Sequence, residues 1–322
     1  MNSKRLEALL ARISQLRIAV IGDFALDFYF QFNPDTAEIS IETGKEVQHA
    51  SQTQTALGGA GNVAKNLAHL GVQVDAYGLR GNDVFGREVA HLAQALNINT
   101  EFLKAKAGID TPTYSKPMRE GIEQNRLDFG TRNANFQNHG LEVIHELAIR
   151  VGNYDWVIIN EQFHMPLLNQ ATLEFLQKFT SEKAIADLRS LGSYAHEVIL
   201  KVNEAEFSKI LPTEMDIESA IKSWVSQRGR PVLLTLGEKG MIYASPEEFH
   251  WEKAIPVLGP IDTVGAGDMV VAAFSASRAA GASIEEACAL ASLAVHVTIH
   301  KIGETGSAQA NEIIQSYHAT RN

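Results

Sequence analysis

Short apolar runs alternate with stretches of helical periodicity along most of the chain. Residues 17–22, RIAVIG, form a run rich in β-branched residues, which is typical of a strand buried on both faces. Similar runs recur at residues 73–77, 100–103, 155–159, 184–186, 198–202 and 232–235. Helical spacing of apolar residues occurs at residues 1–16, 63–70, 85–96, 141–151, 166–179, 215–227, 267–280, 284–300 and 308–317. This alternation predicts an α/β fold, a mostly parallel sheet with helices on both faces.

Two segments break this pattern. Residues 28–55 and 112–129 contain short pieces in which polar and apolar residues alternate, and Gly121 suits a hairpin turn between two such pieces. Alternation is typical of half-exposed strands, which do not belong in a buried parallel sheet. We expect the two segments to form a small β lid over one face of a single domain that spans residues 1–322.

The outer face of this lid is predicted to be an interface. A few strands are too short to be stable alone, and their edges would be unpaired. Phe28, Tyr29, Phe30 and Phe32 would add an exposed aromatic patch. A second copy of the chain, related by two-fold symmetry, would cover the strand edges and the aromatic patch with the same surface. The sequence therefore predicts a homodimer joined through the lids.

Composition narrows the class of protein. The chain has 322 residues, 45% of them hydrophobic and 20% charged, as in an ordinary globular protein. A formal net charge of -10 argues against nucleic acid or an anionic membrane as the main partner. The N-terminal segment lacks the apolar run of a signal peptide, and no stretch approaches the ~18 apolar residues of a membrane span. A cytoplasmic enzyme is therefore expected.

Cysteine and histidine give little sign of metal chemistry. Cys288 is the only cysteine, which excludes an internal disulfide and a multi-cysteine zinc site. His296 and His300 have the spacing of two zinc ligands on a helix, but no third ligand accompanies them. We expect structural or solvated roles for both histidines and a buried core position for Cys288.

The strongest chemical signal is a glycine-rich turn that opens the helix expected at residues 267–280. Gly265 and Gly267 allow the backbone to approach a ligand closely, and Ala266 lies between them. The first amides of a helix have no partner inside it, so with the helix dipole they form an anion site. Asp268, in the first turn, can take a proton from a hydroxyl while those amides stabilise charge on the group that is attacked.

A second glycine-rich turn precedes the helix at residues 63–70. Residues 59–64 match the dinucleotide fingerprint G-x-G-x-x-A, but the polar residues 51–55 stand where that fingerprint needs an apolar strand. Asp23 and Asp27 follow the first strand, where open α/β sheets bind ligands, and their carboxylates can hold sugar hydroxyls. The sequence contains neither the G-x-S-x-G of hydrolases nor a P-loop.

Three motifs occur in a distinctive order: Gly58-Gly59-Ala60-Gly61-Asn62, Asn203-Glu204-Ala205-Glu206 and Asp262-Thr263-Val264-Gly265-Ala266-Gly267-Asp268. Over nearly its whole length the chain resembles the ribokinase-like, PfkB-type family of carbohydrate kinases. The resemblance implies that Asp268 is the catalytic base and that Gly265, Ala266 and Gly267 form the anion hole.

The resemblance implies roles for further residues. Asn203 and Glu206 match the motif that helps to hold Mg²⁺ through water, and Asn203 also borders the nucleotide. Thr235, Gly237, Gly240 and Ser292 match nucleotide-binding positions. Substrate-binding positions correspond to Asp23, Gly58, Gly59 and Asn62, with Asp27 beside them. The carbonyls of Asp262 and Val264 lie where some members bind a monovalent cation such as K⁺, with Gly303 and Ser307 as companions.

Within the family, residues 111–129 and 279–306 look most like the bacterial heptose-phosphate kinase domain. Three segments depart from that pattern. The lid of that kinase contributes basic residues where this chain has Tyr114, Lys116 and Glu120. Residues 160–164 read Asn-Glu-Gln-Phe-His where that kinase has Asp-Tyr-x-Lys-Gly, and residues 187–189 read Asp-Leu-Arg in place of Asp-Pro-Lys. The change at residues 160–164 removes a lysine and adds an acid near the site, so the sequence leaves the sugar open.

The leading interpretation is an ATP-dependent kinase that phosphorylates a hydroxyl of a sugar or sugar phosphate. A nucleoside or vitamin kinase of the same fold is the nearest alternative, and an aromatic residue placed beside Asp23 to stack on a base would favour it. A non-catalytic sugar- or nucleotide-binding regulator is a second alternative, which the retained Asp268, Asn203 and Glu206 oppose. A nicotinamide oxidoreductase is not supported, because the apolar strand that should precede the glycine fingerprint is missing.

Overall fold

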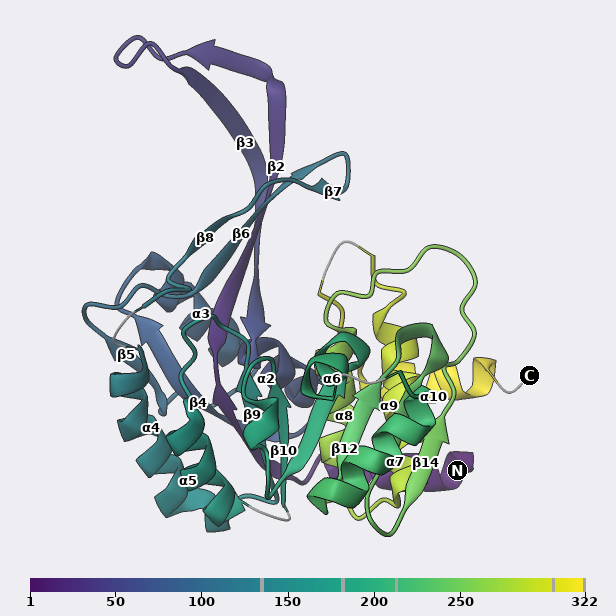
Figure 1. The fold of residues 1–322 in the computed structure, drawn as a ribbon. Coiled ribbons are helices and arrows are strands. Elements are labelled where there is room, and N and C mark those ends of the chain that lie inside the picture. The colour runs from purple at the N-terminus through teal and green to yellow at the C-terminus, as the bar shows by residue number, and fades with distance from the viewer. Residues whose placement is uncertain (134–135, 181–182, 212–213, 303–304, 321–322) are drawn as a thin grey trace.

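The computed structural model describes residues 1–133, 136–180, 183–211, 214–302 and 305–320, and two sheets of unequal size dominate it (Figure 1). Within these ranges, the large sheet has nine strands in the order β14-β13-β12-β11-β10-β9-β1-β4-β5. The strands are β1 (Arg17–Gly22), β4 (Gln73–Gly81), β5 (Leu103–Lys106), β9 (Trp156–Glu161), β10 (Ala184–Leu188), β11 (Ile199–Asn203), β12 (Val232–Thr235), β13 (Met241–Ala244) and β14 (Phe249–Glu252).

The strands from β5 to β12 are parallel, as the sequence predicts. The antiparallel pairs β12–β13 and β13–β14 finish one edge of the sheet. These two short strands were not predicted, because four residues give too little periodicity to detect. The strand expected at residues 100–103 was misplaced: the ladder to β4 begins at Leu103, and upstream of it only Asn99 bridges to Asp75.

Helices cover both faces of the large sheet. One layer, over the face that carries Ile18 and Ile158, contains α1 (Ser3–Ile13), α2 (Ala60–His69), α3 (Val84–Ala95), α8 (Ala266–Ala279), α9 (Ile284–Thr298) and α10 (Ala310–Ala319). The other layer, over Ala19 and Ile159, contains α4 (Phe136–Arg150), α5 (Gln170–Thr180), α6 (Glu204–Ile210) and α7 (Ile217–Arg228). None of the described helices is long and apolar enough to cross a membrane.

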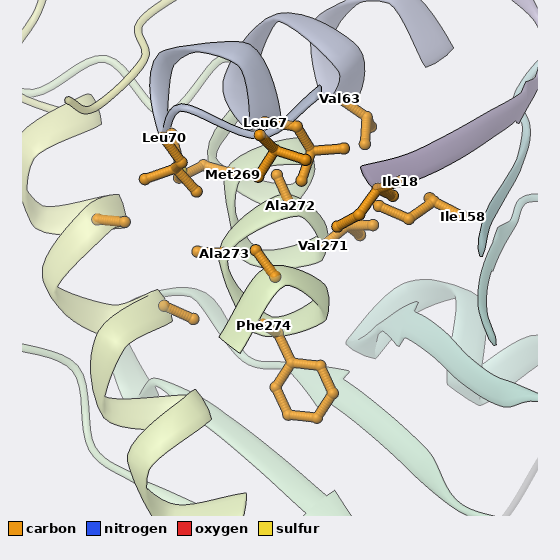
Figure 2. Packing of buried hydrophobic residues seen from close by; sticks show 14 of the residues in the cluster. Ile18, Val63, Leu67, Leu70, Ile158, Met269, Val271, Ala272, Ala273 and Phe274 are labelled. Atoms are coloured by element: carbon orange, nitrogen blue, oxygen red, sulfur yellow. The ribbon is translucent and has the colours of Figure 1, made fainter. Parts of the chain in front are cut away.

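Helix α8 lies at the centre of its layer (Figure 2). All residues from Met269 to Ser277 are buried, so this mainly apolar helix is covered around its whole circumference. Small residues such as Ala272 and Ala273 allow α2, α9 and the sheet to approach it closely, and Phe274 fills the space toward Tyr243, with the two ring centroids 5.9 Å apart. Because its neighbours enclose α8, its N-terminus is fixed beside the carboxyl ends of the central strands.

The two unusual segments form one small sheet, in which β3, β2, β6 and β7 are neighbours and β8 also pairs with β6. Its strands are β2 (Phe24–Ile39), β3 (Glu46–Gly59), β6 (Thr113–Arg119), β7 (Ile122–Glu123) and β8 (Leu127–Phe129). The β2–β3 hairpin extends far from the rest of the chain (Figure 1). β2 follows β1 after Asp23 alone, and β3 runs directly into α2, so the small sheet is joined to the large one at the strand ends.

The predicted exposure of the lid aromatics is wrong. Phe28, Tyr29, Phe30 and Phe32 are half-buried, and the Phe28 ring packs against Phe85 at a centroid distance of 6.3 Å. The hairpin brings Phe28 against Phe30 and α3, and Tyr29 against Lys116 and Thr305, which sequence alternation cannot reveal. The exposed apolar side chains of the two segments are instead Ile39, Ile41, Ile122, Leu127 and Phe129.

Candidate active site

Three polar side chains converge at the carboxyl ends of β9, β10 and β11. Asn160, Asp187 and Lys201 are all buried, and the strand register pairs Asp187 with both of the others. Side chains alternate between the faces of a strand. Each of the three lies two residues after one that packs in the layer of α2 and α8, namely Ile158, Ile185 and Ile199. All three therefore face the N-terminus of α8.

The glycine turn before α8 approaches these groups closely. Gly265 has a φ of +80°, and a Cβ there would lie 2.9 Å from Asn62 Nδ2 and 2.8 Å from Thr305 Cγ2. A Cβ on Gly267 would lie 3.2 Å from Lys201 Nζ. At Gly265 the positive φ and the close side chains both favour glycine, and at Gly267 a Cβ would press on the Lys201 ammonium. The first amides of α8 are thereby brought to the site, as the sequence predicts for an anion hole.

Asp268 is oriented by Asn62, whose Nδ2 donates a hydrogen bond to Asp268 Oδ2 at 2.6 Å. Burial raises the pKa of Asp268 to about 6, although the Asn62 bond lowers it. The charges of Asp187 and Asp27 raise this pKa further, and the Lys201 ammonium opposes them. A carboxylate with this pKa is largely ionised at neutral pH and is a stronger base than an exposed one. The structure thus brings together Asn62, Gly265, Ala266, Gly267 and Asp268.

Buried polar atoms without a protein partner mark the floor of the site. Among the described residues, Asn160 has no hydrogen-bond partner for either side-chain polar atom, and Asn62 Oδ1 has none. A buried polar atom left unpaired costs about 1–3 kcal/mol, so such atoms need a ligand or water. Their position on the α8 side of the strand ends marks the place where a polar ligand fits.

The small sheet contributes an ion pair to the wall of the site. Lys116 Nζ lies 3.1 Å from Asp27 Oδ1 and donates to Tyr29 Oη at 3.1 Å. Burial lowers the pKa of Lys116, but Asp27 and Tyr29 raise it above its usual value. Asp27 is itself buried, and a Cβ on Gly58 would lie 3.2 Å from its Oδ1. Asp27, Gly58 and Lys116 therefore pack together, and the sugar contact predicted for Asp27 and Gly58 stays a prediction.

Asp23 makes backbone contacts that the sequence did not suggest, and its predicted sugar contact stays a prediction. Its carboxylate is fully buried and accepts backbone N–H groups from Gln162, Phe163 and Leu167 at 2.7–3.0 Å. Burial raises its pKa to about 6 against the effect of these three bonds. Both oxygens are occupied, so in this structure Asp23 holds the loop after β9. Its neighbour Gly59 has a φ of +57°, and a Cβ there would lie 2.3 Å from Asp23 O.

Asn203 and Glu206 form a capping box at the start of α6. Asn203 Oδ1 accepts the Glu206 N–H at 2.8 Å, and Glu206 Oε2 accepts the Asn203 N–H at 2.9 Å. In the described residues, no three His, Cys, Asp or Glu side chains are arranged to hold a metal by themselves. One carboxylate with nearby oxygens suits Mg²⁺ that is held mainly by phosphate and water. The donor set therefore fits the predicted role of these two residues, which stays a prediction.

The predicted nucleotide-binding residues lie beyond α6. Thr235 ends β12, and its Oγ1 is 3.4 Å from the Val202 carbonyl oxygen. Gly237 and Gly240 flank the next turn with φ values of +57° and +94°. Ser292 is buried in α9. The first three lie at neighbouring strand ends or in the adjoining turn, while the involvement of Ser292 stays a prediction.

The predicted monovalent-cation residues lie in the segment before α8. Asp262 donates its N–H to the Ile299 carbonyl at 2.8 Å, and its Oδ1 accepts the Val264 N–H at 3.0 Å. The carbonyl of Ser307 accepts a bond from Lys301 Nζ at 2.6 Å, which competes with any cation there. Gly303 lies outside the described residues.

Sequence reasoning missed Lys201, Asn160 and Lys116 as members of the site. One signal was present: Lys201 is the only charged residue in the apolar run of residues 198–202. A lysine in a buried strand must be paired, and paired charges at strand ends gather at sites. Asn160 carried no such signal, because only the strand register shows which face it occupies.

Comparisons with known proteins agree with this geometry. The model of the pfkB family of carbohydrate kinases matches residues 15–311. The protein named Bifunctional protein HldE from Coxiella burnetii is 30% identical over 295 residues, which cover 89% of this chain and 61% of that protein. The chain thus spans about three fifths of the length of that curated relative.

Solved structures show the same fold. Ribokinase from Arabidopsis thaliana, in complex with ribose and ATP, superposes with a TM-score of 0.73 at 20% identity, covering 94% of this chain and 98% of the ribokinase. Phosphofructokinase-2 from Escherichia coli, in complex with potassium, gives 0.72 at 18% identity, covering 95% and 100%. The predicted ribokinase-like fold is confirmed.

Asp23→Asn tests the loop-holding role. The amide places an NH₂ group against backbone N–H donors, so we expect the free energy of unfolding to fall by about 1–3 kcal/mol. Urea unfolding measures this, and limited proteolysis should show earlier cleavage near residues 162–167. Asp110→Asn, at an exposed aspartate, is the control. Unchanged stability together with lost sugar affinity would restore the sugar-binding role of Asp23.

Proposed function

This chain belongs to the pfkB family of carbohydrate kinases, and we propose that it transfers the γ-phosphoryl group of ATP to a hydroxyl of a sugar phosphate. The observation that carries the proposal is the setting of Asp268. Its carboxylate lies at the N-terminus of the enclosed helix α8, is oriented by Asn62, and has a pKa raised to about 6. This combination suits a general base next to an anion site.

The mechanism follows from positioning and charge. Asp268 takes the proton of the acceptor hydroxyl as its oxygen attacks the γ-phosphorus. The amides at residues 265–268 stabilise the charge on the equatorial oxygens of the phosphoryl group, and the small sheet shields the reaction from water. Mg²⁺, when bound, neutralises phosphate charge, and Asn203 and Glu206 would hold it through water. We further propose that Asp262 and Val264 bind K⁺ through their carbonyls.

The substrate class follows from a cavity beside the small sheet. This cavity of about 540 Å³ is lined by Tyr114, Arg126, Asp128, Gly130, Thr131, Arg132, Gln162, Phe163, His164 and Arg189. Its lining includes three arginines and one aspartate, in a chain whose net charge is -10, and Arg126 donates to Asp128 Oδ2 at 2.9 Å. Guanidinium groups bind phosphate through paired, charge-assisted hydrogen bonds. We propose that this cavity holds the phosphate that the sugar already carries.

The acid at Glu161 does not oppose an anionic substrate. Its carboxylate is fully buried and accepts bonds from Ser190 N, Ser190 Oγ and Leu191 N at 2.8–3.2 Å. It therefore shapes the loop that presents Arg189. The heptose-phosphate kinase pattern has a lysine in the segment that corresponds to residues 160–164. In this chain, Arg126, Arg132 and Arg189 would supply the positive charge instead.

The alternatives receive less support. An aromatic ring open to a base beside Asp23 would favour a nucleoside or vitamin kinase. Phe163, whose N–H bonds Asp23, is buried, and the Arg126 guanidinium covers the Tyr114 ring at 4.9 Å from its centroid. A non-catalytic regulator does not account for an aspartate with a raised pKa at the anion site. We also propose that the protein acts in the cytoplasm, where ATP and sugar phosphates are available.

Asp268→Asn tests the base. In a screen of sugars and sugar phosphates by ADP release, we expect the variant to lower kcat by ~10²-fold or more and to leave ATP affinity nearly unchanged. Glu285→Gln, at an exposed acid on α9, is the control. Near wild-type turnover by the Asn variant would refute the assignment.

The same residue predicts the pH dependence. Protonated Asp268 cannot accept the hydroxyl proton, so kcat/KM should fall about tenfold per pH unit below its pKa of about 6. The loss begins at a higher pH than for an exposed carboxyl, because burial raises this pKa. A pH profile for the natural protein that is flat down to pH 4.5 would contradict a base with this pKa.

Arg126→Met and Arg189→Met test the phosphate cavity. Each removes a charge-assisted bond, so we expect KM for the phosphorylated sugar to rise about tenfold or more per variant, with KM for ATP unchanged. Arg119→Met, at an exposed position of β6 outside the cavity, is the control. If the best acceptor is an uncharged sugar, the cavity assignment is wrong.

The assembly remains a prediction: we propose a homodimer joined through the small sheets. The exposed side chains of Ile39, Ile41 and Ile122 support it. Light scattering at micromolar concentration should give twice the chain mass, and Ile39→Lys with Ile122→Lys should return the monomer. Ile149→Lys, an equally exposed change on α4, should leave the dimer intact. A monomer at every concentration excludes this assembly.

A further inference from the structure

Lys201 is a buried lysine whose position needs an explanation. It lies in β11 between the core residues Leu200 and Val202, and the structure buries it almost completely. Its Nζ is 3.1 Å from Asp187 Oδ1, and both side chains are less than a tenth exposed. Removing two charges from water costs several kcal/mol per ion, so such a pair contributes little to stability. A role in the site explains why an ionic pair stands here.

The Lys201 ammonium lies directly under the first turn of α8. A Cβ on Gly267 would lie 3.2 Å from Lys201 Nζ, so glycine leaves no side chain between the ammonium and the turn. Its Nζ also lies 3.1 Å from Asp187 Oδ1, so the ammonium is held on one side by this carboxylate and faces the turn on the other. The group thus lies in the place where the α8 amides meet an anion.

The charge balance of the site calls for a cation. The buried Asp187 pairs with Lys201 at 3.1 Å. Asp268 lies in the first turn of α8 and Glu206 in the first turn of α6, directly after β11, so these carboxylates outnumber the one ammonium of Lys201. The terminal phosphates of ATP add further negative charge, and a fixed positive group near them offsets repulsion in a site with little water. Lysine suits this task as a compact point charge with three donors.

We propose that Lys201 is a catalytic residue. Its ammonium contacts the phosphoryl group that is transferred and donates hydrogen bonds both to Asp187 and to a phosphoryl oxygen. This inference rests on the proposed kinase function. The bond between the acceptor oxygen and the γ-phosphorus forms, and the bond between that phosphorus and the β–γ bridging oxygen breaks. The hydroxyl proton passes to Asp268, ADP leaves with the electron pair, and Lys201 keeps its protons throughout. Asp187 holds the ammonium in place.

The test separates this role from a structural one. Lys201→Met alone leaves Asp187 buried without its partner and can fail to fold, so the main variant combines Lys201→Met with Asp187→Asn. The thermal midpoint shows whether this neutral pair folds, and Lys201→Arg keeps the charge. Lys222→Met, at an exposed lysine of α7, is the control.

We expect the folded double variant to lower kcat by ~10²–10³-fold, as for the loss of one group that stabilises transition-state charge. Calorimetry should show about tenfold weaker binding of AMP-PNP, which carries a γ-phosphoryl group, and unchanged binding of ADP. Lys201→Arg should recover part of both losses. Near wild-type kcat in the double variant, or equal losses for the two nucleotides, would overturn the proposal.

The binding arm also separates this inference from the proposed function. If no sugar or sugar phosphate is phosphorylated, the kinase assignment fails. A Lys201-dependent preference for AMP-PNP over ADP would then still establish the contact with the γ-phosphoryl group. Turnover without that preference would retain the kinase and refute the role of Lys201.

Discussion

The enclosure of α8 is the constraint on which the site depends. This mainly apolar helix is buried around its circumference, and α2, α9 and the large sheet cover it. Its N-terminus therefore cannot move relative to the ends of β9, β10 and β11. Those ends carry Asn160, Asp187 and Lys201, so apolar packing fixes the distances between polar groups at the site. Catalytic geometry requires this rigidity, because an anion site works only if its donors are already in place.

Burial that holds the site together also sets its electrostatics. Asp268 lies near two other carboxylates in a region with little water, and this raises its pKa toward the range of a useful base. The Lys201 ammonium and the Asn62 amide limit that rise. An ionised group held against its preference for water destabilises the fold at neutral pH. The unpaired polar atoms of Asn160 add to this energetic cost, and such unpaired buried groups are typical of ligand-binding sites.

The small sheet is coupled to the same place. β2 continues from β1 through Asp23, which anchors the loop after β9, and β3 leads into the helix that carries Asn62. The Asp27–Lys116 pair joins two strands of the small sheet, and the Tyr29–Thr305 contact, at 3.2 Å, connects that sheet to the segment that faces Gly265. A ligand beneath the small sheet therefore touches groups from both sheets. Movement of the small sheet would change the site without disturbing the core.

The sequence by itself determined the fold class and the chemistry of the main turn. Alternating apolar runs and helical periods are local patterns, and a Gly-Ala-Gly-Asp turn before a helix has one strong chemical use. The sequence did not show that the Asp23 carboxylate accepts three backbone N–H groups or that Lys201 lies beneath Gly267. Nor did it show that Arg126 and Arg189 line the same cavity. These facts depend on strand order and register, which bring together residues far apart in the chain. Only the tertiary structure decides which face a strand end presents, and hence which charges meet.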